Sequence, residues 1–198
     1  MMGRWSGHEA VYKIRNPLPY RLKELDDTIR AQRTVHEAQL MHRAKESGVR
    51  TPYLYYVEPP NALLVMEFIG GTRLTEKVAS MPGSGIRHSF RRLGRLTALL
   101  HMAGIIHGDL TTSNILVNAG ELVLIDFGLA IHSRRLEDRA VDLRLIKETL
   151  TGAHPAISTQ ALESLLDGYA EEVGEKYLRA ITKQVGEIER RGRYARPD

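Results

Sequence analysis

Three polar residues in the middle of the chain are the types that transfer of a phosphoryl group requires. Asp109 lies in the run His-Gly-Asp-Leu-Thr-Thr-Ser-Asn, which ends at Asn114, and Asp126 opens the tripeptide Asp-Phe-Gly. Transfer of a γ-phosphoryl group needs an acceptor for the proton of the attacking hydroxyl and oxygen ligands that hold magnesium against the phosphates. We therefore expect Asp109 to act as the catalytic base or to orient an attacking water. Asn114 and Asp126 are expected to bind magnesium.

A short β-hairpin is expected to bring these two motifs together. Residues 115–117 and 122–125 have the apolar composition of strands, and the turn at 118–120 ends in glycine. Such a hairpin places Asn114 and Asp126 at the same end. Asp-Phe-Gly alone would occur by chance in about 2% of chains of this length, so the prediction rests on the spacing of the two motifs.

A lysine on a strand and a glutamate on a helix are candidates for holding the phosphates. Lys13 lies in residues 10–15, which read as a strand because two prolines follow and forbid further pairing. Residues 25–45 are expected to form one long helix that carries Glu37. In protein kinases a strand lysine contacts the α and β phosphates and is held by a glutamate of the next helix. The buried face of the predicted helix should comprise Leu25, Ile29, Leu40 and Ala44.

A candidate adenine site follows the next two strands, which are expected at residues 53–57 and 63–66. The second strand breaks at a pair of glycines, a pattern that suits a hinge whose backbone groups meet the edge of a base. We expect Glu67 and Ile69 to act through main-chain carbonyl and amide groups, and Met66 to line the back of the pocket. An ordinary loop is the alternative interpretation of this segment.

The second half of the chain has the periodicity of helices. Residues 88–102 are expected to form an amphipathic helix, and three further helical stripes follow Asp-Phe-Gly. His101 on the first helix is expected to be packed in the core. His107 is expected to be packed and to bond the backbone, without a part in catalysis or metal binding. These patterns predict a small strand-rich N-terminal half, a mainly helical C-terminal half and an active cleft between them.

The composition excludes several other classes of protein. The chain has 198 residues, a mass of 22.3 kDa, no cysteine and a formal net charge of +4. Without cysteine there are no disulfides and no thiolate zinc sites, which agrees with a cytoplasmic location. No apolar run approaches the roughly 18 residues of a membrane span, so no association with a membrane is expected.

The end of the chain is basic. Residues 190–198 carry four arginines, one tyrosine and no apolar periodicity. Such a segment neutralises phosphates and stacks on bases, which suits RNA. A solvated, fraying terminus is an equally good interpretation. Contacts to RNA would come from Arg190, Arg191, Arg193 and Arg196.

Together these segments resemble one family, the atypical serine/threonine protein kinase subunit of the KEOPS (EKC) complex in its small archaeal form. The resemblance covers nearly the whole chain, and the Thr-Thr-Ser filling between Asp109 and Asn114 is its most specific feature. It implies an α+β chain with a minimal two-lobed protein-kinase-like fold, made of a small N-terminal β lobe with one long helix and a helical C-terminal lobe. The implied division is residues 1–70, residues 71–189 and a basic tail at residues 190–198.

The resemblance also implies an activity. It points to an ATP-dependent serine/threonine kinase or ATPase that uses magnesium and phosphorylates itself. Such a subunit works beside a larger metalloprotein subunit that makes threonylcarbamoyladenosine in transfer RNA. Two features distinguish the chain from a signalling kinase. Gly108 stands where such a kinase has the arginine that docks a phosphorylated activation loop, and no Ala-Pro-Glu follows Asp-Phe-Gly. Thr111 stands where most protein kinases have lysine, as in this family.

The glycine-rich phosphate loop is the main departure. In kinases it lies on a hairpin before the lysine strand and reads Gly-x-Gly-x-x-Gly, whereas only twelve residues precede Lys13. Gly3 and Gly7 are expected in the turn that leads into the lysine strand. A shortened phosphate loop at residues 7–10 is the alternative, but the six residues up to Lys13 are too few for a strand, a turn and a second strand. We therefore expect the N-terminal lobe to lack its first strand and its glycine-rich loop.

Other functions are compatible with parts of the pattern. A scaffold or RNA-binding subunit with a regulatory nucleotide site is the main alternative, because the phosphate loop is missing and the tail is rich in arginine. A small-molecule kinase of the aminoglycoside or choline type shares His-Gly-Asp-Leu and the asparagine, but such enzymes usually lack Asp-Phe-Gly and run longer. RIO-type kinases differ at the Thr-Thr-Ser and Phe-Gly positions.

Overall fold

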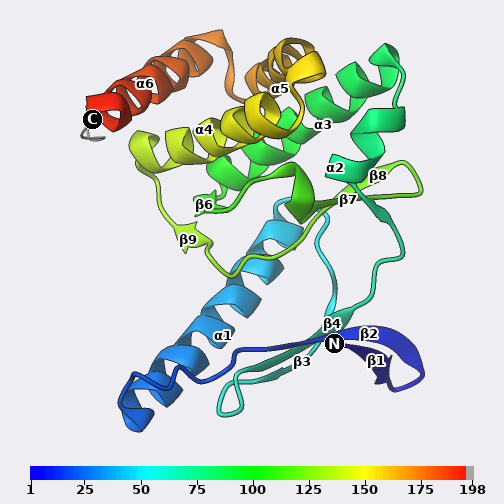
Figure 1. Cartoon of the computed structure of the whole chain (residues 1–198), viewed down its shortest axis with the longest axis vertical. Helices are drawn as coiled ribbons and strands as arrows, with labels where there is room; N and C mark the ends of the chain where they lie inside the picture. Colours follow the sequence, from blue (N-terminus) through cyan, green and yellow to red (C-terminus); the bar gives the residue numbers. More distant parts are fainter. Residues whose placement is uncertain (195–198) are drawn as a thin grey trace.

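The N-terminal half is a four-stranded antiparallel sheet with one long helix (Figure 1). The computed structural model describes the backbone of residues 1–194 and the side chains through Arg191. The helix α1 (Lys23–Glu46) packs against β3 and β4, and the spatial order of the strands is β1-β2-β4-β3. The strands are β1 (Met2–Trp5), β2 (His8–Ile14), β3 (Leu54–Glu58) and β4 (Leu63–Glu67). The predicted positions of β2, β3, β4 and α1 are confirmed to within two residues.

A further strand precedes the lysine strand. β1 pairs with β2 through a two-residue turn at Ser6 and Gly7, both of which have positive φ, as a type I′ turn requires. Gly7 lies in the turn as predicted, whereas the predicted place of Gly3 in that turn is wrong because Gly3 lies within β1. A Cβ at Gly3 would lie 2.9 Å from the ring of Tyr12 on β2. The lack of a side chain at Gly3 therefore leaves room for the Tyr12 ring. The lack of a first kinase strand and of a glycine-rich loop stays a prediction.

Only the second half of α1 enters the apolar core. Leu40 and Ala44 are buried there, as predicted. Leu25 is 54% exposed, so its predicted place on the buried face is wrong, and Ile29 is only half-buried. The first turns of α1 project beyond the sheet (Figure 1), where apolar side chains have no layer to pack against. Asp26 is buried there instead, in an ion pair of 2.7 Å with the residue four positions later.

The C-terminal half is mainly helical, as predicted. Its helices are α2 (Leu74–Lys77), α3 (Gly83–Met102), α4 (Leu136–Ala153), α5 (Ser158–Val173) and α6 (Glu175–Tyr194). One small sheet is formed by β5 (Thr72–Arg73), β7 (Ile115–Asn118) and β8 (Glu121–Leu124), and β6 (Ile105–Ile106) pairs with β9 (Ile131–His132). The predicted hairpin is confirmed, with positive φ at both residues of its turn, Ala119 and Gly120. No helix within residues 1–194 is long and apolar enough to cross a bilayer.

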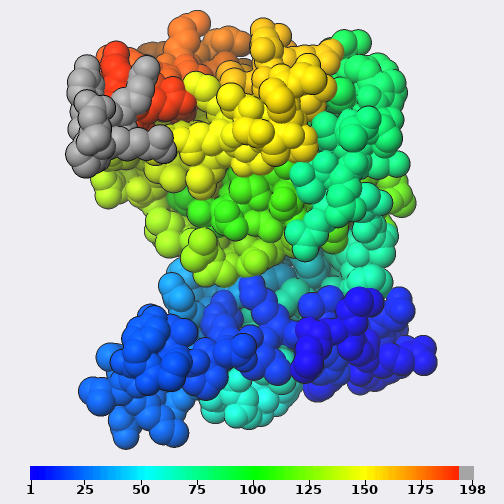
Figure 2. Space-filling model, viewed as in Figure 1, coloured from blue at the N-terminus to red at the C-terminus, as the bar shows by residue number. Residues whose placement is uncertain are grey.

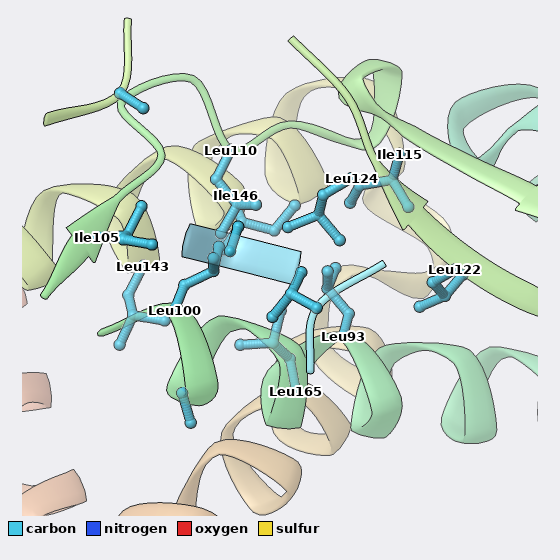
Figure 3. Close-up of a cluster of buried hydrophobic side chains, with 14 of the residues drawn as sticks. Leu93, Leu100, Ile105, Leu110, Ile115, Leu122, Leu124, Leu143, Ile146 and Leu165 are labelled. Carbon is cyan, nitrogen blue, oxygen red and sulfur yellow. The ribbon is translucent and has the colours of Figure 1, made fainter. Parts of the chain in front are cut away.

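Branched apolar side chains fill the core of this half (Figure 3). Leu93 and Leu100 of α3 gather with Leu165 of α5 and with side chains that come from the loop and hairpin, such as Leu110 and Leu124. All five are fully buried. The loop that carries Asp109 is therefore anchored by the same core as the helices.

The helices α3 and α5 approach one another backbone to backbone. A Cβ at Gly94 or at Gly168 would collide with a backbone carbonyl of the opposite helix. Both positions therefore require glycine. This close crossing brings His101 on α3 within reach of Tyr169 on α5.

The predicted basic tail is in part a helix. α6 continues to Tyr194, so residues 190–194 belong to this helix and do not form a separate tail. Arginine is a good helix former. The prediction of a tail relied on the absence of apolar periodicity and therefore overlooked this propensity. Arg191 lies 2.9 Å from Glu137 at the start of α4. Arg196 and the side chain of Arg193 lie outside the described residues.

Candidate active site

A cleft of about 510 Å³ lies where the two halves meet and the molecule narrows (Figure 2). β2, α1 and β4 line it from the N-terminal half, and β5, α2 and β7 line it from the C-terminal half. The lining includes six of the predicted site residues: Lys13, Glu37, Met66, Glu67, Ile69 and Asp126. The other two, Asp109 and Asn114, lie together in the loop before β7 and are not part of this lining.

An ionic cluster joins the two halves across the cleft. Nζ of Lys13 lies 2.7 Å from Oε1 of Glu37 on α1 and 2.6 Å from Oδ1 of Asp126, which follows β8. Only 1% of the Glu37 side chain is exposed, against 29% for Lys13 and 51% for Asp126. A buried carboxylate requires a partner of opposite charge. Glu37 therefore fixes the lysine from behind while the ammonium faces the cleft.

The backbone holds Asp126 in an unusual conformation. Its φ is +62°, in the left-handed region that few residues other than glycine adopt. Oδ1 of Asp126 accepts the amide of Gly128 at 3.2 Å as well as the ammonium of Lys13. Burial acts to raise the pKa of Asp126, but the hydrogen bond and charge of Lys13 outweigh it and hold the pKa below its usual value. The carboxylate is therefore ionised at neutral pH.

Gly128 leaves room for this cluster. A Cβ at Gly128 would lie 3.0 Å from Oδ1 of Asp126 and 3.3 Å from Nζ of Lys13. Both distances are tighter than almost all real Cβ contacts. A side chain at the glycine of Asp-Phe-Gly would therefore crowd the contact between Asp126 and Lys13.

Asp109 and Asn114 contact each other directly. Nδ2 of Asn114 donates to Oδ2 of Asp109 at 2.8 Å and to the carbonyl of Asp109 at 3.0 Å. The amide of Ile125 donates to the carbonyl of Asn114 at 3.0 Å, so the β7-β8 hairpin ties this loop to the residue before Asp126. Because Nδ2 is engaged by Asp109, Oδ1 of Asn114 is the side-chain atom that could ligate a metal ion.

His107 packs beneath the loop. It is fully buried, and its ring centroid lies 4.8 Å from that of Phe127. Nε2 donates to the carbonyl of Ile125 at 3.2 Å, and Nδ1 accepts the amide of Asp109 at 3.3 Å. Burial lowers the pKa of His107 more than the neighbouring carboxylates raise it, so the ring is neutral. The prediction that this histidine is packed and bonds the backbone is confirmed.

Asp142 on α4 holds the loop from behind, a role that was not predicted from the sequence. Its two oxygens accept the amides of His107 at 2.7 Å and of Gly108 at 2.8 Å. Oδ2 of Asp142 also lies 3.3 Å from Nε2 of His101, whose Nδ1 lies 2.9 Å from the hydroxyl of Tyr169. His101 is packed in the core, as predicted. This buried network anchors the backbone just before the candidate catalytic residue.

Arg15 is a second cation that contacts Glu37, and this contact was not predicted from the sequence. Arg15 follows β2 directly and contacts Oε2 of Glu37 through Nη2. Residues i and i+2 of a strand share one face. The spacing between Lys13 and Arg15 was therefore a signal that both side chains point toward α1.

The segment after β4 offers main-chain groups to the cleft. The amide of Glu67 donates to the carbonyl of Tyr53 at 2.7 Å, and Oε2 of Glu67 accepts the amide of Tyr53 at 3.0 Å. Within residues 1–194 the amide of Ile69 has no hydrogen-bond partner. Met66 lines the cleft nearby. Arg73, which sequence reasoning missed, lines the same cleft and donates to a carbonyl of the loop before β7 at 3.0 Å.

The chemistry of these groups fits a nucleotide and a metal ion. Apolar side chains such as Val11, Met66 and Leu116 face the cleft beside the main-chain amide of Ile69, as in sites that bind a base. Asn114 and Asp126 carry side-chain oxygen atoms of the kind that magnesium takes together with substrate phosphates.

Comparison with known proteins places the chain in a family. Residues 11–152 match the protein kinase domain. The chain is 41% identical over 186 residues to the KEOPS complex subunit Bud32 of Pyrococcus abyssi, and the match covers 94% of this chain and 84% of that protein. It is 38% identical over 192 residues to a probable bifunctional tRNA threonylcarbamoyladenosine biosynthesis protein of Methanothermobacter thermautotrophicus. That match covers 97% of this chain but only 34% of the bifunctional protein.

Solved structures show the same fold. WaaP in complex with acyl carrier protein has a TM-score of 0.71 at 18% identity, over 98% of this chain and 83% of that chain. At this identity the likeness concerns the fold alone. The predicted α+β, two-lobed protein-kinase-like fold is confirmed, and so is the resemblance to the KEOPS kinase subunit. The chain therefore belongs to the protein kinase family and, within it, to the Bud32 family.

Proposed function

We propose that this chain binds ATP with magnesium in the cleft and acts as an ATP-dependent serine/threonine kinase or ATPase. The observation that carries the proposal is the shared ammonium of Lys13, which lies 2.7 Å from Glu37 and 2.6 Å from Asp126 at the edge of the cleft. In the proposed site this ammonium binds the phosphates, and the carboxylate of Asp126 beside it binds the metal ion. The contact between Asp109 and Asn114 supplies the remaining parts of a phosphoryl-transfer site.

Each residue has a distinct part in the proposed mechanism. Asn114 and the backbone anchors hold the Asp109 carboxylate, which accepts the proton of the attacking hydroxyl or orients an attacking water. Lys13, steadied by Glu37, binds the phosphates. The adenine meets the main chain of Glu67 and Ile69, with Met66 behind it. Magnesium, when bound by Asn114 and Asp126, neutralises phosphate charge.

Replacement of the catalytic carboxylate tests the mechanism. Asp109→Ala should lower magnesium-dependent release of phosphate from ATP by at least about 100-fold, the usual contribution of a general base. The affinity for ATP should change little, because Asp109 does not line the cleft. The unfolding temperature checks that the variant, which loses one hydrogen bond to Asn114, is still folded. Arg43→Gln, an exposed position of α1, is the control for an ordinary substitution. Unchanged turnover in Asp109→Ala would refute the assigned role.

The same proposal includes an assembly. The names of the relatives associate them with the KEOPS complex and with threonylcarbamoyladenosine in transfer RNA. We infer that this chain works in the cytoplasm beside a metalloprotein subunit and other subunits of such a complex. Transfer RNA would meet the exposed Arg190 and Arg191 of α6, together with Arg193 and Arg196.

A scaffold or RNA-binding subunit whose nucleotide site only regulates assembly is the second candidate. The observation in its favour is the tight turn at Ser6 and Gly7, which offers no glycine-rich cover for phosphates between β1 and β2. Magnesium-dependent ATP hydrolysis, measured alone and with a KEOPS complex plus transfer RNA, separates the two functions. Hydrolysis in either setting supports the enzyme, and none in both supports the scaffold.

A further inference from the structure

Arg15 occupies a place in the ionic cluster that the proposed mechanism does not use. Its Nη2 donates to Oε2 of Glu37, while Lys13 holds the other oxygen, Oε1, at 2.7 Å. Glu37 is 1% exposed and Arg15 is 15% exposed. The buried carboxylate therefore carries one cation on each oxygen.

Arg15 is anchored at both its side chain and its backbone. Nη1 donates to the hydroxyl of Thr34 at 3.2 Å, and Thr34 is fully buried. The carbonyl of Arg15 accepts Nη1 of Arg30 at 3.2 Å, and its amide donates to the carbonyl of Ala62 at 3.2 Å. Thr34 and Glu37 lie three residues apart and so share one face of α1. The guanidinium is thus fixed along that face.

Lys13 has a different position, although it shares Glu37 with Arg15. It lines the cleft and also contacts Asp126, whereas Arg15 is not part of the lining. Lys13 has to hold Glu37 and the phosphate groups together, so the charge of its ammonium is shared between two anions. A buried carboxylate depends on a cation close by. Arginine stays protonated at any pH at which proteins fold, so Arg15 provides Glu37 with a second, permanent cation.

We propose that Arg15 is a positioning residue of the nucleotide site: it neutralises Glu37 permanently and thereby leaves the ammonium of Lys13 available to phosphate groups. The inference rests on the proposed ATP site. Without Arg15 the whole charge of Glu37 falls on Lys13, which draws the ammonium toward α1 and weakens its contact with phosphates.

Removal of the charge of Arg15 is the first test. Arg15→Gln should raise the Kd for ATP, measured by isothermal titration, by about tenfold. Arg15→Lys keeps the charge and should restore most of the affinity. Arg43→Gln removes the same charge from the exposed face of α1 and should leave the Kd unchanged. Equal affinity in Arg15→Gln and wild type would overturn the inference.

A double variant shows whether Arg15 acts through Glu37. Glu37→Gln alone should weaken binding of ATP, because Lys13 loses its support. Adding Arg15→Gln to Glu37→Gln should have no further effect, since no carboxylate is left to neutralise. A purely structural role of Arg15 would give the same loss in both backgrounds, and that result would also contradict the inference.

Two further variants keep the outcome clear. If wild type does not bind ATP, or if Lys13→Ala binds it equally well, the proposed ATP site itself fails and the inference fails with it. If Lys13→Ala weakens binding and Arg15→Gln does not, only the inference fails. Thr34→Val removes just one anchor of Arg15 and replaces Arg15→Gln if that variant does not fold. About twofold weaker binding is then expected, and unchanged binding would refute the role of Arg15.

Discussion

Two buried carboxylates support the candidate site, Glu37 at the cleft in the N-terminal half and Asp142 behind the catalytic loop in the C-terminal half, and they are neutralised in opposite ways. Glu37 is held by the side chains of Lys13 and Arg15, which are partly exposed. Asp142 is held by two main-chain amides and by His101, and within residues 1–194 no lysine or arginine pairs with it. The first carboxylate is held by side chains, one of which, Lys13, lines the cleft, whereas the second is held mainly by the backbone.

This difference indicates that the two carboxylates have different roles, Glu37 in ligand binding and Asp142 in holding the loop. Long cationic side chains can rotate toward a ligand and return, because each keeps its charge in water. Main-chain amides cannot move without the backbone that carries them. The cluster around Glu37 is therefore suited to present the ammonium of Lys13 to phosphates, while Asp142 holds the catalytic loop in one conformation. Substitution at Asp142 should act chiefly on stability, and substitution at Glu37 chiefly on binding.

The largest effect is expected at Asp142. Asp142→Ala leaves two buried amides and His101 without their acceptor, so the free energy of unfolding should fall by about 3–5 kcal/mol. Denaturation in urea measures this loss. Asp167→Ala, an exposed position of α5, should change the free energy by less than about 0.5 kcal/mol. A loss at Asp142 no larger than that of the control would contradict the anchoring role.

A smaller effect on stability and a larger one on binding are expected at Glu37. Glu37→Gln keeps the shape of the side chain, and the cations that it releases, Lys13 and Arg15, reach solvent. The free energy of unfolding should therefore fall by only about 1–2 kcal/mol, while the Kd for ATP rises at least about tenfold. Equal destabilisation by Glu37→Gln and Asp142→Ala would contradict the different roles of the two carboxylates.

The sequence predicted the parts of the site that follow from local spacing. The sequence spacing of Asp109 and Asn114 and the hairpin after them follow from patterns of a few residues. The order of Lys13 and Glu37 follows from the succession of a strand and a helix. The same holds for the existence of α1 and of the helices that follow, since their apolar periods span several turns.

Other features depend on which elements meet in space, and these were missed or misplaced. Asp142 gained its role because α4 packs behind the catalytic loop, which its own neighbours in sequence do not reveal. Leu25 has the right spacing for a buried face, but no layer covers that end of α1. The four residues of β1 include Gly3 and lack the composition of a strand, so only pairing with β2 defines them.

As the pH falls, the region around Asp142 and His107 should be destabilised before Asp126 in the cleft is protonated. His107, whose amide is bound by Asp142, is buried, and burial lowers its pKa below 6.5. Below pH 6.5 the unfolded chain binds a proton that the folded chain does not. The stabilising contribution of neutral His107 is therefore complete above pH 6.5 and is lost as the pH falls from there through the folded pKa. Over that interval Asp126 stays ionised, because Lys13 outweighs the effect of burial and holds its pKa below 3.8.

Urea denaturation near pH 7 and near pH 5.5 measures this dependence, which for one group is at most about 1.4 kcal/mol per pH unit. His107→Asn lacks the titrating ring, so the stability of this variant should fall less steeply with acid than that of wild type. His154, whose pKa is also lowered by burial, contributes equally to both chains and cancels in the difference. Asp126→Asn should keep the wild-type slope, because its carboxylate does not titrate in this range. An unchanged slope in His107→Asn would show that His107 is not the acid-sensitive group, and a reduced slope in Asp126→Asn would assign the acid sensitivity to the cleft.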